Sequence, residues 1–239
     1  MDCTGHRLIL DKPRNVDEAS SLVAHAKRIR TGAIRLEASS TLKIDNLRQL
    51  NENLAAMSLP ICTYGNPILR KKAKEVTEVT DEIRELSREM FVAMHKEHGL
   101  GLAAEQIGRT ERIFVIHIPP DSDADDLGNR ENPDVEMPMV FINPVITAHS
   151  EEVQMGPEGC LSFPDIFANV ERWYEVDAEY TDLDGTAQQL HAKGLLARAI
   201  QHELDHLDGI LLVDRMSHVK KVALSGKLKR MVKKTKQAL

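Results

Sequence analysis

The sequence has few cysteines and few aromatic residues, and it has no long apolar run. Its three cysteines, Cys3, Cys62 and Cys160, are too few and too odd in number for a disulfide framework, so we expect a reducing compartment. One tryptophan, three tyrosines and five phenylalanines leave little for a surface that stacks single-stranded bases. The chain has no run of ~18 apolar residues, which a membrane-spanning helix would need. We therefore expect no DNA partner and no membrane partner.

The N-terminal stretch also lacks the features of a targeting signal. The segment MDCTGHRLILDKPR has no basic region followed by a long apolar core, which a secretory signal would need. Acidic residues in this region count against a transit peptide, which is acid-poor. We expect a cytoplasmic protein, with a bacterial cytoplasm favoured.

The net charge of −6 conceals an uneven distribution along the chain. Residues 215–239 contain nine Lys or Arg and no Asp or Glu, whereas the rest of the chain carries 22 basic and 37 acidic residues. A basic tail of this kind favours an anionic partner such as RNA. The alternative is a solvated helix whose charges only aid solubility.

The chain of 239 residues is long enough for one domain with an appendage. Residues 1–58 show a β-α-β-α pattern that is too short to bury much core alone, so we treat them as an N-terminal extension. Residues 59–216 form the main domain. Residues 217–239 are predicted to be a basic C-terminal helix, with Gly226 as the point at which it could be interrupted.

Hydrophobic spacing predicts the elements of the main domain. A helix is expected to begin at Thr80 or Asp81 and to end at Gly99. Residues 119–138 contain seven Asp or Glu and are predicted to be an exposed loop. The remaining expected elements are strands at residues 112–118, 139–147, 170–180 and 186–191, a hairpin turn at Asp184-Gly185, and a helix over residues 194–208.

The helix expected over residues 194–208 contains the sequence His202-Glu203-Leu204-Asp205-His206. Residues four apart project from one face of a helix, with Cβ atoms ~6 Å apart, so His202 and His206 can bind one metal ion. A carboxylate beside the first ligand can move protons to and from a water at the metal, which suits Glu203. The alternative is two buried histidines that are each satisfied by a hydrogen bond.

A metal site of this kind needs a third protein ligand. Cys160, in the sequence Glu158-Gly159-Cys160-Leu161-Ser162, offers a thiolate that would leave a fourth position for water. Peptidases with this helix pattern commonly take the third ligand from downstream, where His218 is the candidate. The other two cysteines are expected to be small buried apolar residues.

A third segment, GLGLAAEQ at residues 99–106, alternates glycine with apolar residues. Such a backbone can pass close to another backbone or to a ligand. Gln106 could donate its amide N–H to a developing oxyanion. The alternative is a packing junction without a chemical role.

These three segments, in this order, resemble the signature motifs of the peptide deformylase family, which are GxGxAAxQ, EGCxS and HExxH. The similarity covers about residues 59–216, and the acidic loop at 119–138 looks like an insertion. The resemblance implies an α+β fold, with antiparallel sheets around a central metal-binding helix and with an N-terminal extension. It also implies an enzyme that removes formate from the N-formylmethionine of nascent chains.

The resemblance further implies roles for individual residues. The matched positions are the metal ligands Cys160, His202 and His206, the acid/base Glu203, the oxyanion donors Gln106 and the N–H of Leu161, and Gly101 beside the substrate. The family metal is typically Fe²⁺, with Zn²⁺, Ni²⁺ or Co²⁺ as substitutes. The thiolate and imidazole donors alone would instead favour zinc.

Two further expectations concern the substrate and the partner. Leu100, Leu195 and Ala199 are the candidates, by position, for an apolar pocket that holds the methionine side chain. The basic tail looks like the C-terminal segment by which bacterial members dock on the ribosome. Two competing hypotheses are a zinc peptidase in which Cys160 has no role, and an inactive ribosome-associated relative.

Overall fold

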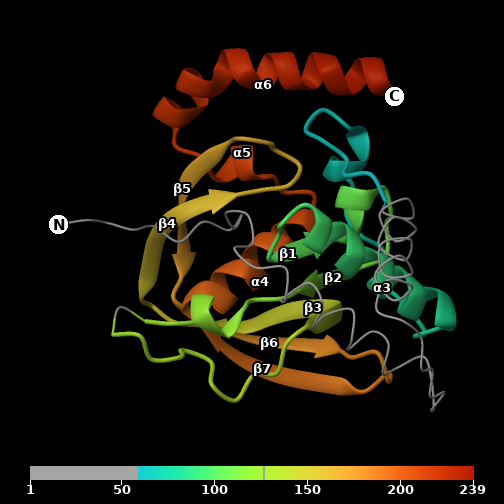
Figure 1. Cartoon of the computed structure of the whole chain (residues 1–239), viewed down its shortest axis with the longest axis vertical. Coiled ribbons are helices and arrows are strands. Elements are labelled where there is room, and N and C mark those ends of the chain that lie inside the picture. The colour runs from blue at the N-terminus through green and yellow to red at the C-terminus, as the bar shows by residue number, and fades with distance from the viewer. Residues whose placement is uncertain (1–58, 126) are drawn as a thin grey trace, which may run out of the picture. The chain divides into compact units, whose positions relative to one another are not determined.

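The computed structural model describes residues 59–125 and 127–239, so the pattern expected for residues 1–58 lies outside the described residues. Two antiparallel sheets carry the fold (Figure 1). The five-stranded sheet has the order β1 (Gly101–Ala103), β2 (Ile113–Ile116), β3 (Met139–His149), β6 (Glu175–Thr181) and β7 (Ala187–Lys193). The two-stranded sheet pairs β4 (Val153–Gly159) with β5 (Phe167–Trp173).

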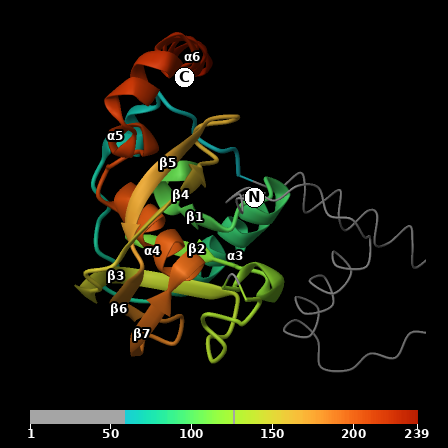
Figure 2. The same cartoon turned by 90° about the vertical axis from the view of Figure 1, so that its left-hand side faces the viewer.

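Four α-helices and three short 3₁₀ turns complete the described chain. Helix α4 (Gly194–Leu207) lies between the larger sheet and the β4–β5 pair (Figures 1 and 2). The remaining elements are α3 (Asp81–Lys96), α5 (Leu212–Arg215), α6 (His218–Ala238), η1 (Pro67–Arg70), η2 (Ala104–Ile107) and η3 (Pro120–Ser122). This arrangement confirms the expected α+β class, with antiparallel sheets around a central helix.

Helix α4 is buried on nearly all sides because both sheets cover it. Its apolar residues Leu196 and Ile200 are fully buried and belong to one core cluster with Phe114 and Phe141 of the larger sheet. A surface helix would show a polar face, but twelve of the fourteen residues of α4 are buried, including both histidines. The metal-binding pattern therefore lies in the interior of the domain.

The single strand expected over residues 170–180 is divided between two strands. Residues 170–173 belong to β5, and residues 175–180 belong to β6. The break is at Tyr174, whose N–H donates to the carbonyl of Glu152 while its own carbonyl accepts the N–H of Gly194. These bonds redirect the chain from the small sheet to the large one. The segment contains no glycine or proline at the break, so its sequence carries no turn signal.

The C-terminal basic segment forms one helix, α6, without an interruption at Gly226. Gly226 is exposed and a single glycine costs a helix only ~1 kcal/mol, so packing elsewhere outweighs it. Leu228 and Thr235 are buried, and the Thr235 hydroxyl donates to the carbonyl of Tyr64 at 3.0 Å. The helix thus packs on the domain through one face.

The acidic loop at residues 119–138 is exposed at many positions but is anchored by buried polar side chains. Asp123 and Asn132 are 4% and 5% exposed, and Asn132 Nδ2 donates to Asp123 Oδ1 at 2.6 Å. Asn132 Oδ1 accepts the N–H of Lys193, directly before α4, at 2.9 Å.

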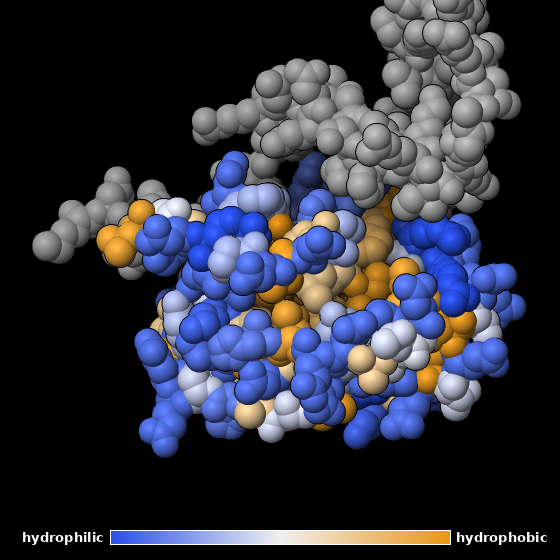
Figure 3. Space-filling model, turned by 90° about the horizontal axis from the view of Figure 1, so that it is seen from below, coloured by the Kyte–Doolittle hydropathy of each residue, from blue (hydrophilic) through white to orange (hydrophobic). Residues whose placement is uncertain are grey.

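Figure 3 shows a mainly hydrophilic surface with smaller hydrophobic patches. No helix in the described part of the chain is long and apolar enough to cross a membrane.

Candidate active site

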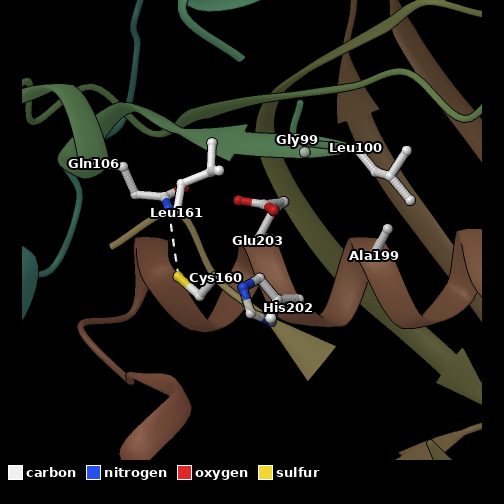
Figure 4. A pocket seen from close by; sticks show the side chains of 10 residues that line it. Gly99, Leu100, Gln106, Cys160, Leu161, Ala199, His202 and Glu203 are labelled. Carbon is white, nitrogen blue, oxygen red and sulfur yellow. Dashed lines mark hydrogen bonds between the residues drawn. The ribbon is translucent and has the colours of Figure 1, made fainter. Parts of the chain in front are cut away.

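The three segments identified from the sequence meet around one cavity beside α4 (Figure 4). Helix α4 supplies one wall, the segment that leads into β1 and η2 supplies a second, and the turn after β4 supplies a third. The lining residues are Gly99, Leu100, Gly101, Gln106, Gly159, Cys160, Leu161, Ala199, His202 and Glu203. Of these, Gly99 and Gly159 were not predicted, although each lies next to a motif residue.

Three side chains at this cavity form a metal-binding cluster. The ligand atoms of Cys160, His202 and His206 lie within 4.8 Å of one another, and Cys160 Sγ is 3.2 Å from His206 Nε2. Burial lowers the pKa of His206 well below its usual range, so this imidazole is neutral, as a ligand must be. One thiolate and two imidazoles fit a divalent transition metal and leave a further position open. His218 is exposed at the start of α6 and is not in the cluster.

A buried ionic network holds the first histidine of the cluster. Glu158 Oε2 is 2.9 Å from His202 Nδ1, which leaves Nε2 of that ring for the metal. Arg172 donates to both oxygens of Glu158, and Arg198 donates to one of them at 2.9 Å. Burial alone would raise the pKa of Glu158, but the hydrogen bonds from His202 and Arg172 outweigh it and lower the pKa. The two arginines were not predicted, because their partners lie far away in the sequence.

Glu203 is buried beside the cluster and faces Gly101 across the cavity. A Cβ atom at position 101 would lie 2.9 Å from Glu203 Cδ, closer than real Cβ contacts allow, so any side chain there must displace the Glu203 carboxyl group. Burial raises the pKa of Glu203 to about 7. Its Oε2 atom is buried and has no hydrogen-bond partner in the described part of the chain. A carboxyl group with this pKa can both accept and release a proton near neutral pH.

Gln106 and Leu161 lie on the side of the cavity nearest to Cys160 (Figure 4). Gln106 Oε1 accepts the N–H of Ala103 at 2.8 Å, which turns the amide nitrogen toward Cys160 Sγ, 3.6 Å away, and Ser162 Oγ, 3.4 Å away. Leu161 is the residue after Cys160, and its backbone N–H takes part in no hydrogen bond among the described residues. The Gln106 amide nitrogen therefore lies beside the metal cluster, and Leu161 lines the same cavity with its N–H unpaired among the described residues.

The residues expected to hold an apolar side chain divide into two groups. Leu100 and Ala199 are both 2% exposed and line the cavity. Leu195 is half-buried, one helical turn before Ala199, and packs against the core beneath the large sheet without lining the cavity.

Glu105, beside Gln106, is fully buried, and burial raises its pKa to about 8. Its burial was not expected from the sequence.

The buried Cys-His-His cluster, the adjacent carboxyl group and the α+β fold together define a metal-dependent hydrolase. The family model for polypeptide deformylase matches residues 58–222. The chain therefore belongs to the peptide deformylase family, whose members remove the formyl group from N-terminal formylmethionine. The match also confirms the family expected from the three motifs.

Individual relatives agree with the family assignment. The chain is 40% identical to peptide deformylase 2 of Gloeobacter violaceus, over 77% of this chain and 91% of the relative. It is 43% identical to the peptide deformylase of Salinibacter ruber, over 74% of this chain and 89% of the relative. The crystal structure of a Synechococcus elongatus peptide deformylase superimposes with a TM-score of 0.61 at 38% identity, over 71% of this chain and 87% of that one.

Replacing Gly101 by alanine tests the close approach of Glu203. The added methyl group must displace the Glu203 carboxyl group, and a shift of ~1 Å at a reacting group can cost ~100-fold in rate. We expect kcat for deformylation to fall by about that factor while the metal content stays unchanged. Gly226→Ala is the matched control, because its Cβ would meet only Arg230 Nη1 at 3.6 Å. A Gly101→Ala enzyme with normal kcat would contradict the assigned contact.

Proposed function

We propose that this deformylase works through Glu203 as acid and base, with Gln106 and the Leu161 N–H as oxyanion donors and with Fe²⁺ as its metal. The observation that carries the proposal is the buried Glu203 carboxyl group with an unpartnered oxygen beside the Cys-His-His cluster. In this proposal residues 59–216 form the catalytic domain and residues 217–239 form a docking helix. Residues 1–58 are an N-terminal extension to this domain.

The reaction needs an activated water and a carboxylate that relays one proton. Cys160, His202 and His206 would hold a divalent ion, which would lower the pKa of a water molecule and polarise a carbonyl oxygen. Glu203 accepts a proton from the water that attacks the formyl carbon. It then gives a proton to the nitrogen of methionine as the carbon–nitrogen bond breaks, which releases formate and a free amine. The raised pKa of Glu203 suits both steps.

Negative charge develops on the formyl oxygen during the attack. In this proposal the Gln106 amide and the Leu161 N–H donate to it, which their place in the cavity lining supports, and each donor of this kind contributes ~3 kcal/mol in comparable reactions. The space opposite Gly101 is filled by the Glu203 carboxyl group, which favours formyl, the smallest acyl group, over acetyl. Leu100 and Ala199 supply an apolar wall for the methionine side chain, whereas Leu195 packs on the core and is left out of this wall.

The metal, the compartment and the partner are inferred from the family and from charge. Fe²⁺ is the typical metal of the family, although the thiolate and imidazole donors also suit Zn²⁺. A bacterial cytoplasm agrees with the bacterial sources of the Gloeobacter violaceus and Salinibacter ruber relatives. The exposed Lys and Arg residues of α6 form a positive face that suits ribosomal RNA.

The first test is formate release from an N-formylmethionyl tripeptide. Enzyme prepared without oxygen and loaded with Fe²⁺ should release formate, whereas the N-acetyl tripeptide should remain intact. Loading with Zn²⁺ in a parallel sample tests the metal, and we expect the Fe²⁺ enzyme to have the higher kcat. Equal or faster turnover with Zn²⁺ would argue against iron. If neither the Fe²⁺ sample nor the Zn²⁺ sample releases formate, the proposed reaction is overturned.

The substitution Glu203→Gln tests the proton relay. It keeps the size of the side chain but removes its ability to accept and return a proton, which in general acid–base catalysis contributes ~100- to 10,000-fold. We expect kcat to fall by at least ~100-fold, with the metal content measured by emission spectroscopy unchanged. Turnover near the wild-type rate would show that another group moves the proton.

Neutralising the exposed face of α6 tests ribosome docking. A variant with Gln at Lys229, Lys233, Lys234 and Lys236 should co-sediment with ribosomes at least ~10-fold more weakly, because each lost phosphate contact weakens binding. Binding of the wild-type protein to ribosomes should weaken as the salt concentration is raised. The α6 variant should release formate from a tripeptide at the wild-type rate. Gln at the exposed Lys71 and Lys72 is the matched control. Equal co-sedimentation of both variants and wild type would rule out α6 as the docking helix.

A further inference from the structure

The outer face of the β4–β5 pair exposes large apolar side chains. Val153 is 49% exposed, Met155 is 63% exposed and Trp173 is 37% exposed. Val153 lies directly opposite Trp173 in the register of the two strands. The Trp173 ring stacks on His149, with ring centroids 3.7 Å apart and planes inclined by 5°. Three large apolar residues thus remain largely exposed on one face of this strand pair.

Strand β4 leads from this apolar face to the cavity that holds the metal cluster. Side chains alternate between the two faces of a strand, so Val153, Met155, Pro157 and Gly159 share one face of β4. The other face turns toward α4, as the hydrogen bonds of Glu158 and Gln154 to helix residues show. Gly159 lines the cavity. We name these four residues, together with Trp173, the β4 stripe.

We propose that the β4 stripe binds the apolar side chains of the nascent peptide downstream of its formylmethionine. This inference rests on the proposed function, because it places the formyl group at the metal cluster. A strand rises ~3.3 Å per residue, so Met155 lies ~13 Å and Val153 ~20 Å beyond Gly159. An extended peptide that leaves the cavity at Gly159 reaches Met155 with about its fifth residue and the Val153–Trp173 pair with about its seventh. A tripeptide ends before either.

Acidic side chains border the stripe and refine the peptide that it fits. Glu171 is exposed and lies opposite Met155 in the strand register. Glu151 and Glu152, directly before β4, are also exposed. Carboxylates on this rim repel acidic side chains and attract basic ones. The favoured substrates are therefore nascent chains with apolar residues near positions five to seven and with few acidic residues between them.

The test compares a short and a long substrate on Met155→Asp. The substrates are an N-formylmethionyl tripeptide and a heptapeptide with leucine at positions five and seven. We expect kcat/KM for the heptapeptide to fall about fivefold, mainly through KM, because a carboxylate replaces an apolar contact. The tripeptide should be turned over as by wild type. Val145→Asp, at a 53% exposed valine of β3 in the other sheet, is the matched control and should change neither substrate.

A second readout does not depend on turnover. Trp173 is the only tryptophan of the chain, so its fluorescence reports on the stripe directly. Titration with the heptapeptide should change the emission in wild type and require about fivefold more peptide in Met155→Asp. Unchanged emission, or an equal loss of kcat/KM on both substrates, would overturn the stripe as a binding surface. Failure of wild type to release formate from the tripeptide would instead contradict the proposed function, while the fluorescence titration would still judge the stripe.

Discussion

The carboxylate of Glu158 is the contact on which the geometry of the site depends. It is fully buried and accepts hydrogen bonds from His202, Arg172 and Arg198, so it ties β4 and β5 to α4. Removal of one of these partners would cost several kcal/mol, because the carboxylate would stay buried with less compensation. Because Cys160 follows Glu158 by two residues, the same contact brings the thiolate to the histidines. Ligand orientation and strand position are therefore set together.

Glycines allow the charged side chains of α4 to reach so close to the neighbouring backbone. Glu203 occupies the space where a side chain at position 101 would begin, and Arg198 does the same at Gly156, where a Cβ would lie 3.0 Å from the guanidinium. In both places a strand lacks a side chain where the helix has a long polar one. The close approach excludes water from the carboxyl group, and this burial is what raises the pKa of Glu203.

Sequence reasoning succeeded where the chemistry requires a particular residue type at a particular spacing. The separation of His202 and His206 predicted one ligand face on a helix, and the structure brings Cys160, the predicted third ligand, into the same cluster. The division between β5 and β6 at Tyr174 could not be predicted, because hydrogen bonds to distant carbonyl and N–H groups make that break. The ion pairs of Arg172 escaped prediction for the same reason, since its partners are 14 and 33 residues away.

The tail helix and the catalytic cavity are joined by a short rigid path. The Thr235 hydroxyl of α6 donates to the Tyr64 carbonyl, and the N–H of Tyr64 donates to the carbonyl of Ser162 at 2.9 Å. Two residues earlier, the N–H of Cys62 donates to the Gln106 carbonyl at 2.6 Å. Segments on both sides of the cavity are thereby tied to the helix that carries the positive face. Because the rest of the domain is acidic, its surface would repel a polyanion that bound α6, so the docking proposed above would fix how the cavity is oriented.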